Sequence, residues 1–169
     1  CLATVANKNA AKTCSVDLTK QITWDSMLED GKKLHAENPD YYYMNTDTKI
    51  LCEYVLRPYL RQMTGESFII DSEKKMSFTR DQLVEVLTYI KDCYDGGVFE
   101  PAEDSATFKG QIHTNPKWMD GKFVFAYGPS SSINLLMDAV PEAECTVVQM
   151  PMAEDRVNDG FFADTPQYM

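Results

Sequence analysis

The sequence has few cations. Its 169 residues include 16 Lys and Arg against 26 Asp and Glu, which gives a formal net charge of −10. Binding the phosphates of a nucleic acid needs clustered Lys and Arg side chains. The densest basic runs here are only the pairs Lys32–Lys33 and Lys74–Lys75. We therefore predict no nucleic-acid partner, and an anionic membrane surface is disfavoured for the same reason.

Long apolar runs are absent as well. No run approaches the roughly 18 residues that a membrane-spanning helix needs, and no leader with a basic start and an apolar centre is visible. The chain has no initiator Met and opens on an extended apolar pattern from Leu2 to Ala6, so we expect a piece cut from a longer protein. With 44% apolar residues, it can bury enough surface for one compact domain.

Motifs for metals and catalysis are missing too. The five cysteines are widely spaced and form no CxxC pair, so we expect neither a zinc site nor a dense disulfide framework. Cys52 and Cys93 lie in helical patterns and are predicted to be buried. His35 and His113 are isolated, and no HExxH, GxSxG, GxGxxG or Walker motif occurs. We predict no metal, no cofactor and no catalytic residue, and we interpret acidic groups such as that at Glu100 as solvated.

Short strands and helices alternate along the chain. Apolar patterns predict strands at 2–6, 41–44, 122–127 and 145–150, and a surface hairpin over 67–78. Helices are predicted after Thr23, Thr79 and Asn115, and along an apolar stripe from Ile50 to Tyr59 that Pro58 would kink or split. Because helices separate most of the strands, the expected fold is α/β, a small mixed sheet covered by helices.

Helical spacing also predicts which side chains are buried. After Thr79, the expected inner face consists of Leu83, Val86, Leu87, Ile90 and Tyr94. Trp24 and Trp118 have helical neighbours, so we interpret both as core residues, and Met119 is expected to face inward beside Trp118.

Two polar segments follow predicted strands. Asn45, Thr46 and Asp47 come after the strand at 41–44, and the turn at 127–132 contains Tyr127, Ser130, Ser131 and Ser132. In open α/β sheets ligands bind outside the carboxyl ends of strands, and free backbone N–H groups at a helix start can bind oxygen atoms. Each segment also fits a plain structural role, a helix-capping loop for the first and a capped turn for the second.

Four stretches in order carry a resemblance to a known family. They are Ala6–Ala10, Thr23–Leu34, Phe78–Gly97 and Trp118–Phe125. Their order and spacing resemble those of four segments of bacterial extracellular solute-binding proteins, family 1, which are the carbohydrate-capturing components of ABC importers. In turn, these are a hinge segment, a segment with the motif TWDEL, a helix, and a helix–strand unit with the motif GKaAM. Two positions depart from the pattern. Ser26 replaces the usual Glu, so we expect an incomplete capping box, and Ala6 replaces the usual Tyr, which puts a ligand role there in doubt.

The resemblance implies that residues 1–169 form a single lobe, most of the C-terminal lobe of a two-lobed protein with the periplasmic-binding-protein-like type II fold. It implies non-catalytic capture of a carbohydrate by closure of the two lobes. The implied partners are the sugar, the missing first lobe and ABC permease subunits. The implied location is extracellular, with anchoring to the cell surface through the parent lipoprotein.

The resemblance also assigns ligand-facing positions. These are Asn45 to Asp47, Tyr127, Ser130 to Ser132 and, in the tail, Phe162. A lone lobe would supply half of the contacts, so its sugar affinity is expected to be weak or undetectable. The first and last residues should lie close together. Asn45 and Ser131 should face one concave surface.

Two other functions stay open. A glycan-processing enzyme would need two carboxylates about 5–10 Å apart in a cleft. A protein-interaction module would present an exposed apolar patch away from the loop end of the sheet.

Overall fold

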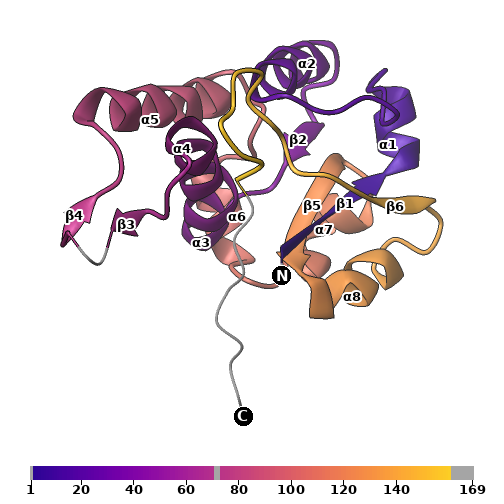
Figure 1. The fold of residues 1–169 in the computed structure, drawn as a ribbon. Coiled ribbons are helices and arrows are strands. Elements are labelled where there is room, and N and C mark those ends of the chain that lie inside the picture. The colour runs from indigo at the N-terminus through magenta and orange to yellow at the C-terminus, as the bar shows by residue number, and fades with distance from the viewer. Residues whose placement is uncertain (1, 71–72, 161–169) are drawn as a thin grey trace.

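A four-stranded mixed sheet forms the centre of the fold. The computed structural model describes residues 2–70 and 73–160. The strands are β1 (Leu2–Asn7), β2 (Tyr42–Met44), β5 (Phe123–Pro129) and β6 (Cys145–Val148), in the order β2-β5-β1-β6. β2 and β5 are parallel, and β1 runs antiparallel to both of its neighbours (Figure 1). The predicted α/β class with a mixed sheet is confirmed.

The remaining elements are mostly helical. They are α1 (Lys8–Thr13), α2 (Trp24–Glu37), α3 (Thr48–Ile50), the π-helix η1 (Leu51–Leu56), α4 (Arg57–Thr64), α5 (Arg80–Asp95), α6 (Ala102–Thr107), the 3-10 helix η2 (Ile112–Thr114), α7 (Pro116–Met119), the 3-10 helix η3 (Ser130–Ser132) and α8 (Ile133–Asp138). The predicted hairpin is present as β3 (Ile69–Ile70) paired antiparallel with β4 (Lys75–Met76).

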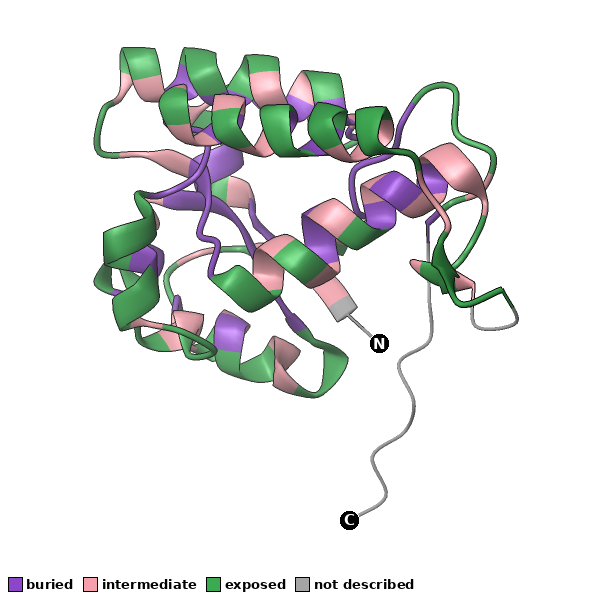
Figure 2. Cartoon of the chain, turned by 90° about the vertical axis from the view of Figure 1, so that its left-hand side faces the viewer, coloured by how far each residue is buried: buried purple, intermediate pink, exposed green. Residues whose placement is uncertain are grey.

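Helices cover both faces of the sheet. Ala6 and Tyr127 pack in one apolar cluster with α2, η1 and α5, whereas their strand neighbours Val5 and Ala126 pack in a second cluster with α7 and α8. Figure 2 shows the inner strands of the four-stranded sheet buried while the helices expose their outer faces. The two clusters hold one tryptophan each, at 24 and 118, and both side chains are buried as predicted.

The two longest helices begin at capping boxes. The Thr23 hydroxyl accepts from the Ser26 backbone N–H at 3.0 Å, and Ser26 Oγ accepts from the Thr23 backbone N–H at 2.9 Å. Thr79 and Gln82 form the same pair of bonds at the start of α5. The expectation that Ser26 leaves its capping box incomplete is therefore wrong, because a serine hydroxyl reaches the backbone N–H that a glutamate usually serves.

Three burial predictions are wrong. Leu87 is 49% exposed and Met119 is 47% exposed, and Cys52 is exposed. On α5 the buried residues are Val86, Tyr89 and Cys93, so the inner face is rotated away from Leu87. Cys93 is buried as predicted. The periodicity of an amphipathic helix indicates which residues form its apolar stripe, but the elements that pack against the helix determine which part of that stripe is buried.

Pro58 does not split the helical segment that contains it. The chain is helical from α3 through η1 to α4, and the proline occupies one of the first positions of α4. Proline has no backbone N–H, and its ring excludes the carbonyl four residues earlier. The wider π turn just ahead of Pro58 accommodates that missing bond without ending the helix.

Residues 150–160, which we call the strap, return along α2 and α4 (Figure 1). Gln62 of α4 is fully buried, and its Oε1 accepts from Trp24 Nε1 and from the Ala153 backbone N–H, both at 2.7 Å. Gly160 has φ +73°, and a Cβ there would lie 2.9 Å from the Pro58 carbonyl oxygen. Only glycine fits this close approach, so the strap is fixed against α4.

Candidate functional site

The carboxyl ends of β2 and β5 meet at one edge of the sheet because the two strands are parallel. A cavity of about 230 Å³ opens there. Its polar lining side chains are Asn45, Asp47, Lys49, Glu53, His113 and Ser132, and its apolar ones are Ile50, Phe108, Ile112, Tyr127, Pro129, Leu135 and Leu136. Both polar segments singled out in the sequence therefore reach one concave surface.

Asp47 has a structural role as well as a place in the cavity wall. Its Oδ1 accepts from the Ile50 backbone N–H at 2.8 Å, which caps α3, and its Oδ2 accepts from the Gly110 backbone N–H at 2.9 Å. The side chain is 7% exposed. The capping interpretation of this loop is thus correct for Asp47, and the carboxylate is held rigidly at the edge of the cavity.

Asn45 is held by a buried carboxylate. Its Nδ2 donates to Glu100 Oε2 at 2.5 Å and to Ser105 Oγ at 3.0 Å. Glu100 is 1% exposed and also accepts from Asn115 Nδ2 at 3.1 Å and from Lys117 Nζ at 2.8 Å. The interpretation of Glu100 as a solvated loop residue is wrong. A buried carboxylate needs such partners, and together they fix the loop after β2.

Lys117 supplies the countercharge in this network. Partial burial lowers the pKa of Lys117, but its hydrogen bonds with Asp104 and Glu100 outweigh that effect and raise the pKa above the ordinary value. The ammonium therefore stays charged at neutral pH, and the buried Glu100 carboxylate keeps its counter-ion.

Thr46 does not line the cavity. It is 1% exposed, and its hydroxyl is bonded to the Tyr94 hydroxyl at 2.8 Å. The loop after β2 therefore brings two of its three predicted residues, Asn45 and Asp47, to the cavity, and joins the third to α5.

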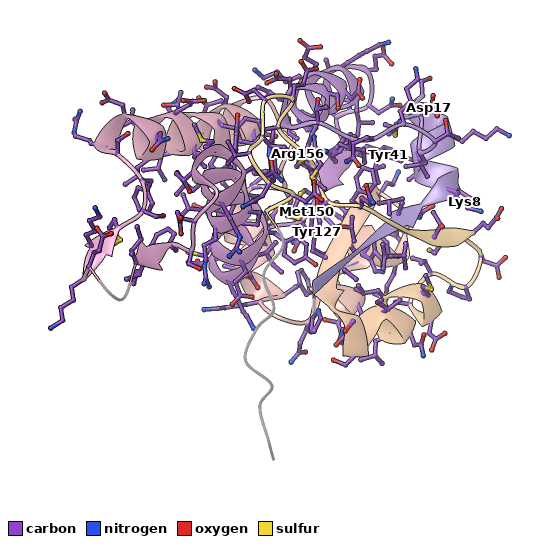
Figure 3. The ribbon with its side chains drawn as sticks, viewed as in Figure 1. Lys8, Asp17, Tyr41, Tyr127, Met150 and Arg156 are labelled. Carbon is purple, nitrogen blue, oxygen red and sulfur yellow. The ribbon has the colours of Figure 1, made fainter. Side chains whose placement is uncertain are left out.

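Tyr127, labelled in Figure 3, belongs to β5 and is one of the residues that line the cavity. It is 5% exposed, and its ring centroid is 4.1 Å from that of Tyr54. Burial raises the pKa of Tyr127 well above its usual range, so the phenol is neutral at physiological pH. The Tyr54 hydroxyl donates to the Ala3 carbonyl at 2.7 Å, which fastens η1 to β1.

The serine turn contributes one side chain. Ser132 is half-buried and lines the cavity, whereas Ser130 and Ser131 are exposed and do not. No serine hydroxyl caps α8, and this six-residue helix is too short to offer a strong dipole. Phe162 lies outside the described residues, as do Cys1 and Met169, so the predicted closeness of the two ends stays a prediction.

The sequence interpretation missed the apolar part of the wall. Phe108, Ile112 and His113 come from a segment that looks polar overall, and Leu135 of α8 is 52% exposed beside the cavity. The only available signal was a pair of apolar residues, Phe108 and Ile112, in an otherwise polar stretch.

Across residues 2–70 and 73–160, no group of three or more His, Cys, Asp or Glu side chains is placed to hold a metal ion. Over the same residues, no helix has the length and apolar character needed to cross a bilayer.

Scans of the sequence against family models and against curated proteins give no match. Solved structures do match. The periplasmic solute-binding protein ECA2210 of Pectobacterium atrosepticum superposes with a TM-score of 0.81 at 18% identity, over 95% of this chain and 41% of that one. The chain has the fold of the extracellular solute-binding proteins. The match confirms the periplasmic-binding-protein-like architecture that the resemblance implied.

Two further structures agree. An extracellular solute-binding protein family 1 from Alicyclobacillus acidocaldarius has a TM-score of 0.75 at 17% identity, over 94% of this chain and 38% of that one. A Yersinia enterocolitica periplasmic oligogalacturonide-binding protein in complex with saturated digalacturonic acid has a TM-score of 0.79 at 22% identity, over 95% and 40%. This chain spans about two fifths of the length of these structures. A designed cysteine esterase also has this fold, at a TM-score of 0.79 and 20% identity.

Proposed function

We propose that this chain is the C-terminal lobe of a two-lobed protein that captures a carbohydrate for an ABC importer without catalysing a reaction. The observation that carries the proposal is the single cavity at the joined carboxyl ends of β2 and β5. Similar folds include proteins whose ligands are digalacturonic acid and cycloalternan.

The lining suits one face of a sugar. Phe108, Ile112 and Leu135 supply apolar surface that can pack on the C–H face of a sugar ring. His113 and Ser132 supply polar atoms for hydroxyl groups. Such a mixture of apolar walls and a few polar groups is typical of small-molecule sites.

A second lobe would complete the site. Closure of two lobes around a ligand is a population shift between open and closed states, and a permease would recognise the closed form. We propose an extracellular location, with anchoring through the parent lipoprotein, as part of the same function.

The two carboxylates of the cavity do not favour a glycan-processing enzyme. Both oxygens of Asp47 already accept backbone N–H groups, and Glu53 is paired with Lys49 at 3.9 Å. A glycosidase needs one free acid to donate a proton and a second to act as nucleophile or base. We therefore propose binding rather than catalysis.

The test is a titration of the isotopically labelled chain with neutral oligosaccharides, followed by NMR. We expect millimolar affinity, because one lobe supplies half of the contacts, with shifts confined to the residues that line the cavity. Leu135→Ala should weaken binding several-fold. Val147→Ala is the matched control, because both side chains are 52% exposed and only Leu135 lines the cavity. Shifts elsewhere would contradict the proposed site, and micromolar affinity would mean that the site is complete without a second lobe.

A further inference from the structure

The charged side chains of the cavity wall are mostly negative. Asp47 and Glu53 carry carboxylates there, and Lys49 carries the only ammonium or guanidinium group among the described lining residues. Lys49 Nζ lies 3.9 Å from Glu53 Oε2, so this cation is already partnered. The remaining titratable groups among the described lining residues are the imidazole of His113 and the phenol of Tyr127, which is held neutral by burial that raises its pKa.

The Asp47 carboxylate is fixed in the wall, and the helical segment that carries Glu53 is fixed against the sheet. Asp47 is bonded through both oxygens to backbone N–H groups of Ile50 and Gly110, and it is 7% exposed. The Glu53 side chain is 25% exposed and projects from η1, which Tyr54 ties to β1. The negative charge at the site is therefore built into the fold.

A ligand carboxylate placed in this cavity would face like charges in a partly desolvated space. Such repulsion is stronger than in bulk water because the effective dielectric constant is lower. A hydroxymethyl group at the same position of a sugar meets no such penalty, since it is uncharged and can donate a hydrogen bond to a carboxylate.

We propose that this wall selects uncharged sugars and excludes uronic acids. The inference rests on the proposed function and specifies its ligand class. It separates this chain from the Yersinia protein of similar fold, whose structure holds digalacturonic acid.

The closing experiment compares two disaccharides that differ only in the oxidation state of carbon 6, α-1,4-galactobiose and digalacturonic acid, with maltotetraose as a second neutral sugar. NMR titrations of the labelled chain at one fixed pH give each affinity. We expect a neutral sugar to bind at least about tenfold more tightly than digalacturonic acid, and a high salt concentration to narrow the difference.

Two variants distinguish the effect of the charge in the cavity wall from the effect of the overall charge of the protein. Glu53→Gln removes one carboxylate and frees Lys49, so the ratio of digalacturonic acid affinity to neutral-sugar affinity should rise about tenfold. Glu29→Gln removes the same charge from an exposed position on α2 and should leave that ratio unchanged.

Digalacturonic acid binding as tightly as the best neutral sugar would overturn the inference and leave the proposed function intact. An equal response of the Glu53 and Glu29 variants would also overturn it. The millimolar affinity expected above lies within the range of an NMR titration, so a titration to high sugar concentration in which no sugar shifts any cavity residue would overturn the proposed function, and the inference with it.

Discussion

At the scale of single residues, the polar side chains of the site serve both structure and binding. Asp47 was predictable as a cap and as a wall residue from its place after a strand. Glu100 was not, because its burial depends on Asn45, 55 residues away in sequence, and on Lys117, which follows it by 17. Sequence patterns report local spacing, whereas a buried charge is defined by partners that only the fold assembles.

Replacing Glu100 tests that assembly. Glu100→Gln keeps the shape but removes the charge that holds Lys117, so we expect a loss of about 2–4 kcal/mol in the free energy of unfolding. Urea denaturation monitored by circular dichroism gives this value. Glu103→Gln, at an exposed position nearby, should change stability by less than about 0.5 kcal/mol. Similar losses in the two variants would show that the buried network contributes little.

At the scale of elements, most helix starts were predictable because capping is local. Thr23, Thr79 and Asn115 each cap the helix that the sequence places after them. The face that a helix buries was less predictable, as Leu87 shows. The shared edge of β2 and β5 was only a geometric hypothesis, because 78 residues lie between these strands and sequence does not state whether they are neighbours.

The start and the middle of α5 should respond differently to the same substitution. Thr79→Ala removes the hydroxyl that accepts from the Gln82 backbone N–H and should cost about 1 kcal/mol. Thr88 lies mid-helix, is exposed and donates to the Val84 carbonyl, so Thr88→Ala should be neutral or slightly stabilising. Chemical denaturation of both variants measures the difference. If Thr88→Ala destabilised the chain as much as Thr79→Ala, capping would not explain the effect.

At the scale of the whole molecule, the core contains many ionisable groups held in their neutral form. Burial raises the pKa of Tyr43, Tyr54 and Tyr89 well above the usual tyrosine value. Burial likewise raises the pKa of Cys93 to about 12 and that of Cys14 to about 11, from 9.0. The unfolded chain releases these protons at lower pH than the folded chain does.

Stability should therefore fall as the pH rises. A group with a raised pKa contributes its full stabilisation below its unfolded pKa and loses it as the pH rises through the folded value. The thiols begin this loss above about pH 9 and the phenols above about pH 10. Tyrosinate absorbance should increase together with the loss of helical circular dichroism. A fold that persists while all tyrosines ionise near pH 10 would show that the phenols are accessible.

The strap has a mechanical consequence. The hydrogen bond from the Ala153 backbone N–H to Gln62 and the close approach of Gly160 to Pro58 hold residues 150–160 tightly against α4. If two lobes close around a sugar as proposed, the strap and α4 would move as one rigid unit during that closure. The sugar-facing wall would then keep its shape while its distance from the opposite lobe changes.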